Sequence, residues 1–249
     1  MADDFSRGSQ GGRFPATRRS AVVAVSSDDP AERARSFEIL VRAYWKPVYK
    51  HLRVRWRLSS EQAEDLTQGF FARALEQRMF AAYDPARALF RTYLKTCLDR
   101  HVMKDAESRM RQKRGGGTVT LSLDFHAAER ELEGLAAPSR ETIESYFDRE
   151  WTRHLVGMTV DALRERCEQS GKQATYRVFE RYVLDDGPAA RPSYAELALE
   201  LGIKVTDVTN YLAFARREFR RLLLEKLREI TGSEEECQTE ARALLGGSP

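Results

Sequence analysis

The chain has 249 residues, with 41 Lys and Arg against 38 Asp and Glu, a net charge of +3, and 42% hydrophobic residues. A chain of this length can bury a core without disulfides, and its composition excludes a disordered polyelectrolyte. No apolar run approaches the roughly 18 residues of a membrane-spanning helix and the first residues do not resemble a secretory signal, so we expect a cytoplasmic protein with no membrane partner. Cys97, Cys167 and Cys237 are odd in number and far apart, which favours reduced thiols over disulfides.

Helical periodicity dominates the first half of the chain. Apolar residues recur at helical spacing from Phe37 to Leu52, with an expected kink at Pro47. The sequence SSEQ at 59–62 is typical of a capping box and predicts the start of a second helix. A turn at YDP, residues 83–85, precedes a third helix that is expected to run from 90 to 114, where the triplet GGG ends it.

The second half is also predicted to be helical, after a Glu-rich connector. We expect a helix over 151–167 and a shorter one after a break at Gly171. Ser193 is then expected to cap a short helix, Gly202 to make a turn and Thr206 to cap a longer helix, which is a helix-turn-helix arrangement. Strand signals are nearly absent, so the predicted fold is all-α with two helical domains. The predicted divisions are a disordered N-terminal arm over 1–30, a first helical domain over 31–114, a linker over 115–140, a second helical domain over 141–231 and an acidic tail over 232–249.

The small net charge averages segments of opposite sign. Residues 42–60 carry six cations and no acid, residues 91–114 have a net charge of +5, and residues 216–228 have a net charge of +4. Residues 124–150, in contrast, have a net charge of −5. Basic helical segments on both sides of an acidic connector are expected of a protein that touches a nucleic-acid backbone at two places. The alternative is that each basic stretch is an ordinary solvated helix face.

Four stretches of sequence resemble those of the extracytoplasmic-function (ECF) sigma factors of bacterial RNA polymerase. AYWKPVY at 43–49, AEDLTQGFFARAL at 63–75 and YDPARALFRTYL at 83–94 make residues 40–114 similar to sigma region 2. YAELALELGIKVTDVTNYLAFARREFRRLL at 194–223 makes residues 193–227 similar to region 4. RFPATRRS at 13–20, RQKRGGG at 111–117 and SLDF at 122–125 further resemble a subgroup with a long connector between the two regions.

The resemblance implies an all-α protein in which a region 2 helical bundle and a region 4 helix-turn-helix are joined by an acidic linker. It implies a sigma factor that binds bacterial core RNA polymerase, recognises the −10 and −35 elements of promoter DNA and opens the strands for transcription initiation. It leaves open whether an anti-sigma factor or a regulatory kinase controls the protein.

By resemblance, the second helix would bind core polymerase, because carboxylates and an amide on one exposed face can form charge-assisted hydrogen bonds with Arg side chains. The implied polymerase-binding residues are Glu61, Glu64, Asp65 and Gln68. Without the resemblance, an ordinary polar helix face would be the favoured interpretation of these four residues.

The implied −10 surface is the turn and helix that follow Tyr83. Strand opening costs a few kcal/mol of unstacking, and the single strand is then held by pockets, aromatic stacking and cations. The implied −10 residues are Pro85, Ala86, Arg87, Ala88, Leu89, Phe90, Arg91, Tyr93, Lys95, Arg100 and Lys104. Phe90 and Tyr93 can also be interpreted as core residues, which their i,i+3 spacing favours for at least one of them.

In region 4 the longer helix of the motif would enter the major groove of the −35 element, with arginines placed for phosphates or polymerase. The implied −35 residues are Thr206, Asp207, Thr209, Asn210, Tyr211, Arg216, Arg217 and Arg220. Among them, Asn210 can read adenine through a bidentate pair.

Gly69 departs from the family pattern, in which Glu is usual, and it lowers helix propensity by about 1 kcal/mol. This departure motivates an alternative function, a free-standing helix-turn-helix regulator that has lost polymerase binding. An enzyme is the third reading, but no catalytic constellation, cofactor motif or metal site stands out; Cys97 and His101 are at i,i+4, and two ligands make no site. A further hypothesis is that the acidic tail covers the basic helix over 216–228 in the free protein.

Overall fold

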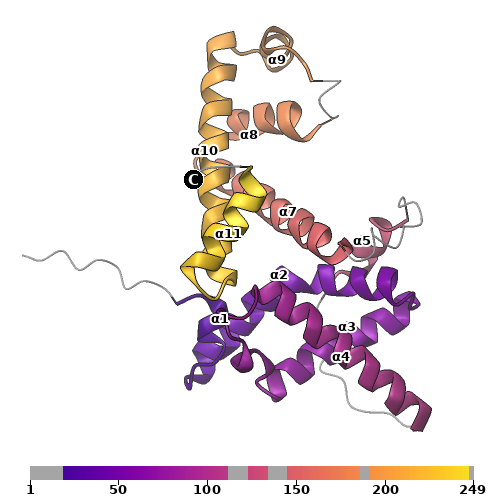
Figure 1. Cartoon of the computed structure of the whole chain (residues 1–249). Helices are drawn as coiled ribbons and strands as arrows, with labels where there is room; N and C mark the ends of the chain where they lie inside the picture. Colours follow the sequence, from indigo (N-terminus) through magenta and orange to yellow (C-terminus); the bar gives the residue numbers. More distant parts are fainter. Residues whose placement is uncertain (1–18, 112–122, 134–144, 186–190, 247–249) are drawn as a thin grey trace, which may run out of the picture.

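The computed structural model describes residues 19–111, 123–133, 145–185 and 191–246, and of residues 107–111 it describes the backbone alone. Within these ranges the chain is helical and contains no strand, which confirms the predicted all-α fold (Figure 1). None of the described helices is long and apolar enough to cross a membrane.

The first part of the chain forms four α-helices and one 3₁₀ turn. They are α1 (Ala21–Ala24), α2 (Pro30–Arg55), α3 (Ser60–Glu76), η1 (Met79–Ala82) and α4 (Phe90–Arg111). α2 begins before the predicted Phe37, because Asp29 accepts a hydrogen bond from the Ala31 amide and Pro30 starts the first turn. α3 begins with the predicted capping box, in which the Ser59 and Gln62 side chains each accept a hydrogen bond from the other residue's amide.

The predicted N-terminal arm is too long. Residues 19–30 were assigned to it, but Ser20 caps α1, and Ala21 and Val22 of that helix are buried against α2. The physical reason is the short apolar run AVVAV, which gains by burial even though it is too brief to show a period. Residues 1–18 lie outside the described residues.

The remaining helices begin in the connector. They are α5 (Phe125–Arg130), α7 (Tyr146–Gln169), α8 (Gln173–Phe179), the π-helical turn η2 (Glu180–Leu184), α9 (Tyr194–Leu201), α10 (Val205–Ile230) and α11 (Glu234–Leu245). Much of the predicted linker, 115–122 and 134–140, lies outside the described residues, as does 112–114 at the end of the third predicted helix.

One hydrophobic core joins distant parts of the chain. Trp151 of α7 stacks on Tyr44 of α2, with ring centroids 6.3 Å apart and planes at 22°. Leu223 and Leu227 of α10 enter the same core, whereas Leu163, in the second half of α7, packs with α8 and α10 in a separate cluster. The predicted domain division between 140 and 141 therefore does not coincide with a division of the core, because α7 belongs to both parts.

Candidate polymerase and promoter surfaces

α3 presents a polar face to solvent. Its capping box fixes the first turn, and Ala63, Leu66 and Phe70 anchor the opposite face in the core. The predicted polymerase-binding residues share the outer face: Glu61 and Asp65 are exposed, and Glu64 and Gln68 are half-buried. The structure thus brings all four onto one surface.

Gly69 lies one turn after Asp65 on α3, beside it at the edge of the polar face that is nearest α4. A Cβ atom added at Gly69 would lie 3.9 Å from Nε2 of His101 in α4, which is an ordinary van der Waals distance. Burial lowers the pKa of His101, and the nearby Arg73 guanidinium lowers it further. The Cβ position of Gly69 therefore points toward α4, while the residue itself adjoins Asp65.

The turn predicted at 83–85 is present and extends to residue 89, with an exposed tip. The Asp84 carboxylate accepts a hydrogen bond from the Ala86 amide at 3.0 Å and pairs with Arg87 at 3.2 Å. The Tyr83 hydroxyl lies 2.9 Å from the Ala88 carbonyl oxygen, which closes the turn from inside. Of the predicted −10 residues here, Pro85, Ala86 and Arg87 are exposed, and Ala88 and Leu89 are half-buried.

Phe90, the first residue of α4, is buried, in contrast to the tip of the turn. The Phe90 ring is fully buried against Tyr83, with centroids 5.1 Å apart, so the core interpretation holds for Phe90. Arg91 does not face solvent as a phosphate contact: its Nε lies 2.8 Å from Oε1 of Glu240 in α11, and its guanidinium lies 5.1 Å from the Trp151 ring centroid. Residues of α7 and α11 therefore contact the Arg91 side chain, which is one of the predicted −10 residues.

The outer side of α4 borders a basic pocket of about 290 Å³. Three of the predicted −10 residues, Tyr93, Arg100 and Lys104, line it. Tyr93 is fixed there because its hydroxyl donates a hydrogen bond to the Met79 carbonyl at 2.8 Å. Lys95 is half-buried on the same helix.

Two arginines of the pocket were not predicted from the sequence. Arg73 and Arg78 also line the pocket, from the end of α3 and the turn that follows it. Arg78 has φ +46°, a left-handed conformation that costs a non-glycine residue about 1 kcal/mol. Arg73 and Arg78 lie outside the basic segments 42–60 and 91–114, and two cations five residues apart do not by themselves predict a binding site.

The helix-turn-helix is formed by α9 and α10. Ser193 and Glu196 form a capping box at the start of α9. At the end of α9, Gly202 has φ +65°, a backbone conformation that favours glycine. The prediction that Thr206 caps α10 is wrong: α10 begins at Val205, and Asp207 accepts a hydrogen bond from the Lys204 amide at 3.2 Å. Asp207 can cap the helix because its carboxylate lies in the first turn of α10, where a negative charge is stabilised by the amides that have no partner within the helix.

The predicted −35 residues occupy the outer side of α10. Thr206, Thr209 and Asn210 are exposed at its start, and Tyr211 is half-buried. Further along, Arg216 and Arg217 are exposed and Arg220 is half-buried, with Arg216 lying 5.7 Å from the Tyr182 ring centroid. Figure 1 shows α9 and the start of α10 projecting away from α2, α3 and α4.

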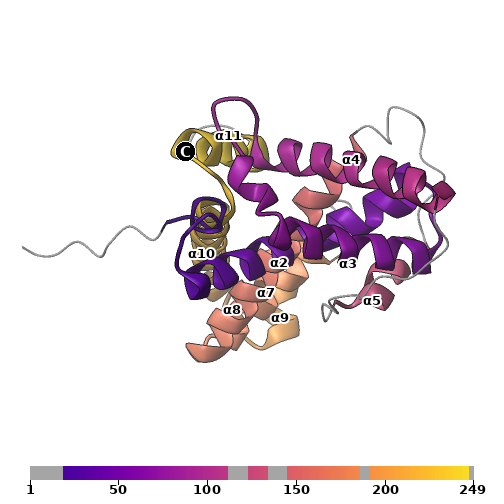
Figure 2. The same ribbon diagram turned by 90° about the horizontal axis from the view of Figure 1, so that it is seen from below.

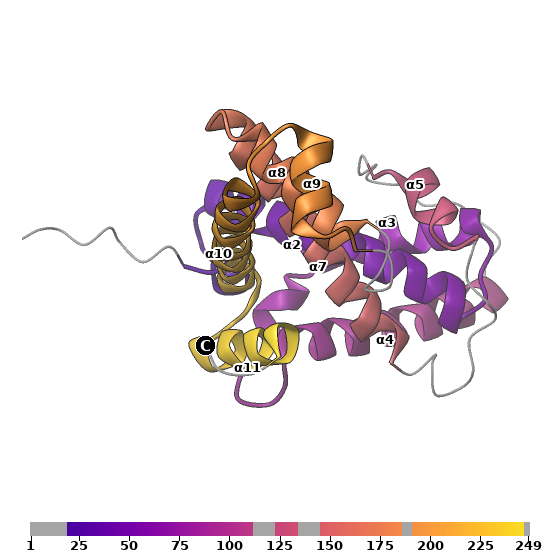
Figure 3. The same cartoon turned by 90° about the horizontal axis from the view of Figure 1, so that it is seen from above.

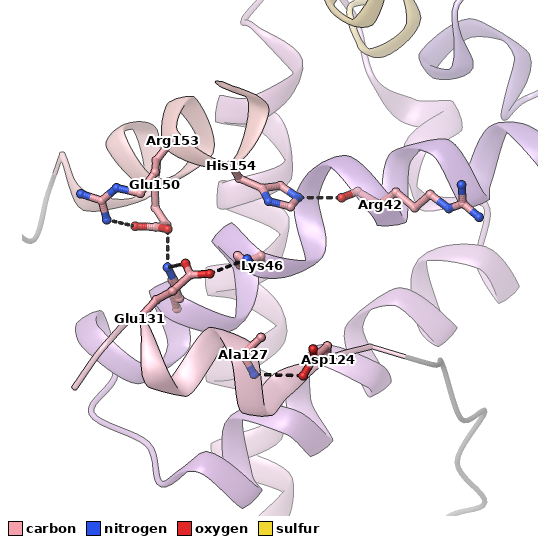
Figure 4. Close-up of polar contacts among 9 residues, drawn as sticks. Arg42, Lys46, Asp124, Ala127, Glu131, Glu150, Arg153 and His154 are labelled. Atoms are coloured by element: carbon pink, nitrogen blue, oxygen red, sulfur yellow. Dashed lines mark hydrogen bonds and ion pairs between the residues drawn. The ribbon is translucent and has the colours of Figure 1, made fainter. Parts of the chain in front are cut away.

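The acidic connector folds back on the basic segment of α2 (Figure 4). Glu131, just after α5, accepts hydrogen bonds from Lys46 at 2.7 Å and from Lys50 at 2.6 Å. Glu129 pairs with Arg53 at 2.6 Å, which is the main reason that its pKa is lowered. Three cations of the run 42–60 therefore neutralise connector carboxylates and do not form a nucleic-acid surface in this state.

α7 completes this network. The Glu150 carboxylate lies 2.5 Å from the Lys50 ammonium and 2.9 Å from the Arg153 guanidinium, and Figure 4 shows Glu150 beside Arg153 on α7. On the same helix, His154 lies 2.8 Å from the Arg42 carbonyl oxygen. Together, these contacts hold α2, the connector and α7 in one arrangement.

Comparison with known families shows to which family the chain belongs. The sequence model of the ECF sigma factor family matches residues 21–225, which is most of the chain. The chain belongs to the ECF sigma factor family. The match begins at the first residue of α1 and ends inside α10, so α11 lies outside it. Searches of curated proteins and of solved structures gave no match.

Membership of this family implies a role in transcription initiation, with RNA polymerase and promoter DNA as partners. Sigma factors are not a class of enzymes. In the part of the chain that the structure describes, no group of three or more His, Cys, Asp or Glu side chains is placed to hold a metal ion. Cys97, Cys167 and Cys237 are free thiols, all buried.

Proposed function

We propose that this ECF sigma factor binds core RNA polymerase through α3, holds the opened −10 strand along α4 and contacts the −35 element with α10. The main support for this proposal is the polar face of α3. Glu61, Glu64, Asp65 and Gln68 share that face, and none of them forms an ion pair or side-chain hydrogen bond with another described residue. A face of this kind offers carboxylates and an amide to Arg side chains of a partner.

The basic pocket beside α4 supports the −10 part of the proposal. Tyr93 offers an aromatic surface for a base, and Arg100, Lys104, Arg73 and Arg78 offer cations for the backbone. This combination suits an unpaired strand better than a duplex, because a splayed base needs a pocket and a stacking partner.

The exposed start of α10 supports the −35 part. Thr206, Thr209 and Asn210 place short polar side chains at the end of the helix that enters the major groove in proteins with this motif. Arg216 and Arg217 lie about two turns further along, where a phosphate backbone would pass.

The test is co-elution with bacterial core RNA polymerase by size-exclusion chromatography. The wild type is expected to co-elute, and Asp65→Arg is expected to abolish co-elution by placing a cation against polymerase arginines. Glu229→Arg is the matched control, because Glu229 is exposed on α10 and the substitution changes the charge equally. Failure of the wild type to co-elute, with binding to duplex DNA by the protein alone, would favour the free-standing regulator.

A further inference from the structure

The C-terminal helix α11 docks against the start of α4. Figures 2 and 3 both show it beside the first turns of α4. Glu236 of α11 is 5% exposed and Glu240 is 2% exposed, although both are acidic residues near the end of the chain. Buried carboxylates require hydrogen-bond donors or cations around them. The partners of Glu236 and Glu240 therefore show which groups α11 binds.

Glu236 accepts hydrogen bonds from the segment that begins the −10 surface. One carboxylate oxygen accepts from the buried Phe90 amide at the start of α4, and the other accepts from the Gly232 amide at 2.6 Å. The second oxygen also lies 2.9 Å from the Tyr83 hydroxyl. One turn later, Glu240 pairs with Arg91 at 2.8 Å. A helix amide, a hydroxyl and a guanidinium thus hold two anions.

Close packing accompanies these polar contacts. A Cβ atom added at Gly232 would lie 2.5 Å from Cε1 of the Tyr83 ring, so only glycine permits this approach. Cys237 and Ala241 are buried in the main core on the same side of α11. The exposed side of the helix carries Glu234 and Glu235. α11 is therefore a fitted element of the fold.

The tail does not use these carboxylates to cover the basic part of α10, as the sequence hypothesis supposed; Glu236 and Glu240 face the 83–91 segment. We infer that α11 is an autoinhibitory element whose two carboxylates occupy the anion-binding groups of the −10 surface in the free protein and must leave before promoter DNA phosphates can bind there. The inference rests on the proposed −10 role of this segment. It explains why Arg91 is paired with Glu240 while the pocket on the other side of α4 is open.

Two independent variants of the whole 249-residue chain test the inference. Gly232→Ala pushes the tail off the Tyr83 ring and leaves the carboxylates intact. The double variant Glu236→Gln/Glu240→Gln replaces one accepting oxygen at 236 by an NH2 donor, which then faces a backbone amide, and it removes the charge that pairs with Arg91. Glu234→Gln/Glu235→Gln is the control, because it removes the same charge from the exposed side of the same helix.

The measurements are hydrogen exchange of the backbone amides of 237–245 and anisotropy of a fluorescein-labelled single-stranded DNA pool of mixed sequence. Both test variants are expected to exchange faster in α11 and to bind the DNA more tightly than wild type. If α11 is docked in about nine-tenths of molecules, the gain is about tenfold, because apparent affinity scales with the competent fraction. The control is expected to match wild type in both measurements.

Three results would overturn the inference: faster exchange without tighter DNA binding, unchanged exchange in both test variants, or an equal gain in the control. The co-elution of wild type and Asp65→Arg with core polymerase is unaffected by any of these results. Loss of wild-type co-elution contradicts the proposed function, whereas a failed tail experiment contradicts the autoinhibitory contact alone.

Discussion

Lys50 of α2 and Glu150 of α7 form an ion pair that is buried on both sides. The ammonium and a carboxylate oxygen lie 2.5 Å apart, with 0% of the Lys50 side chain and 2% of the Glu150 side chain exposed. Glu131 of the connector joins the same ammonium. Ions leave water at a cost of several kcal/mol each, so this site holds only if all of its charges are matched.

Lys50→Met is expected to lower the free energy of unfolding by about 3 kcal/mol, because it leaves two carboxylates without their shared cation. The additional change Glu150→Leu is expected to recover most of the loss. Urea unfolding measures both. Arg42→Met is the control: its ion pair with Glu38 is exposed on both sides and contributes less than about 1 kcal/mol. Equal effects at Lys50 and Arg42 would contradict this account.

Arg78→Gly is expected to separate stability from DNA binding. Glycine relieves the left-handed backbone and is expected to raise the free energy of unfolding by up to about 1 kcal/mol. The same change removes a cation from the basic pocket, so binding of single-stranded DNA is expected to weaken. Arg57→Gly is the matched control, because Arg57 has φ +51° and does not line the pocket. A parallel loss of DNA binding in both variants would argue against the pocket.

Gly69→Ala is expected to stabilise the protein by about 1 kcal/mol, because alanine favours the helix and its Cβ meets only an ordinary contact with His101. Binding to core polymerase is expected to be unchanged. Thermal unfolding and co-elution measure the two effects. Gly171→Ala is the opposite control: Gly171 has φ +67°, so alanine there is expected to destabilise. Loss of polymerase binding in Gly69→Ala would place Gly69 on the interface.

Glu240 gives the stability a specific pH dependence. Burial raises its pKa to about 7; Arg91 opposes the shift, and Glu236 and Asp148 add to it. Because the folded pKa lies above the unfolded value, the folded state holds the proton more tightly, and stability falls as pH rises toward 7. From pH 6 to pH 8 this group is expected to remove about 1 kcal/mol. Urea unfolding of wild type beside Glu240→Gln, in which that component is absent, measures it; identical pH profiles would contradict it.

Local signals explain what could be predicted from the sequence. The capping boxes at 59–62 and 193–196 and the turn at Gly202 depend on residues within one helical turn, so they can be identified without tertiary structure. The grouping of Glu61, Glu64, Asp65 and Gln68 on one face follows from the helical period alone. The assignment of Tyr93, Arg100 and Lys104 to the −10 surface, in contrast, came from the resemblance to ECF sigma factors.

Long-range pairing explains what could not be predicted. A count of charges along 42–60 does not reveal that Lys46, Lys50 and Arg53 are matched by carboxylates of the connector and α7. Similarly, the short tail after Gly232 has no strong period, and its docking depends on Tyr83, far away in sequence. The pairing of Arg91 with Glu240 could not be predicted either, because the neighbours of α4 decide which of its cations face solvent.

The most direct test of the proposed function is transcription of fragmented genomic DNA from the host by core polymerase with this sigma factor, followed by mapping of RNA 5′ ends. The account predicts new start sites that share upstream −10 and −35 sequences and disappear with Asp65→Arg. Absence of any start site that depends on the added protein, while the protein still binds duplex DNA by itself, would contradict it.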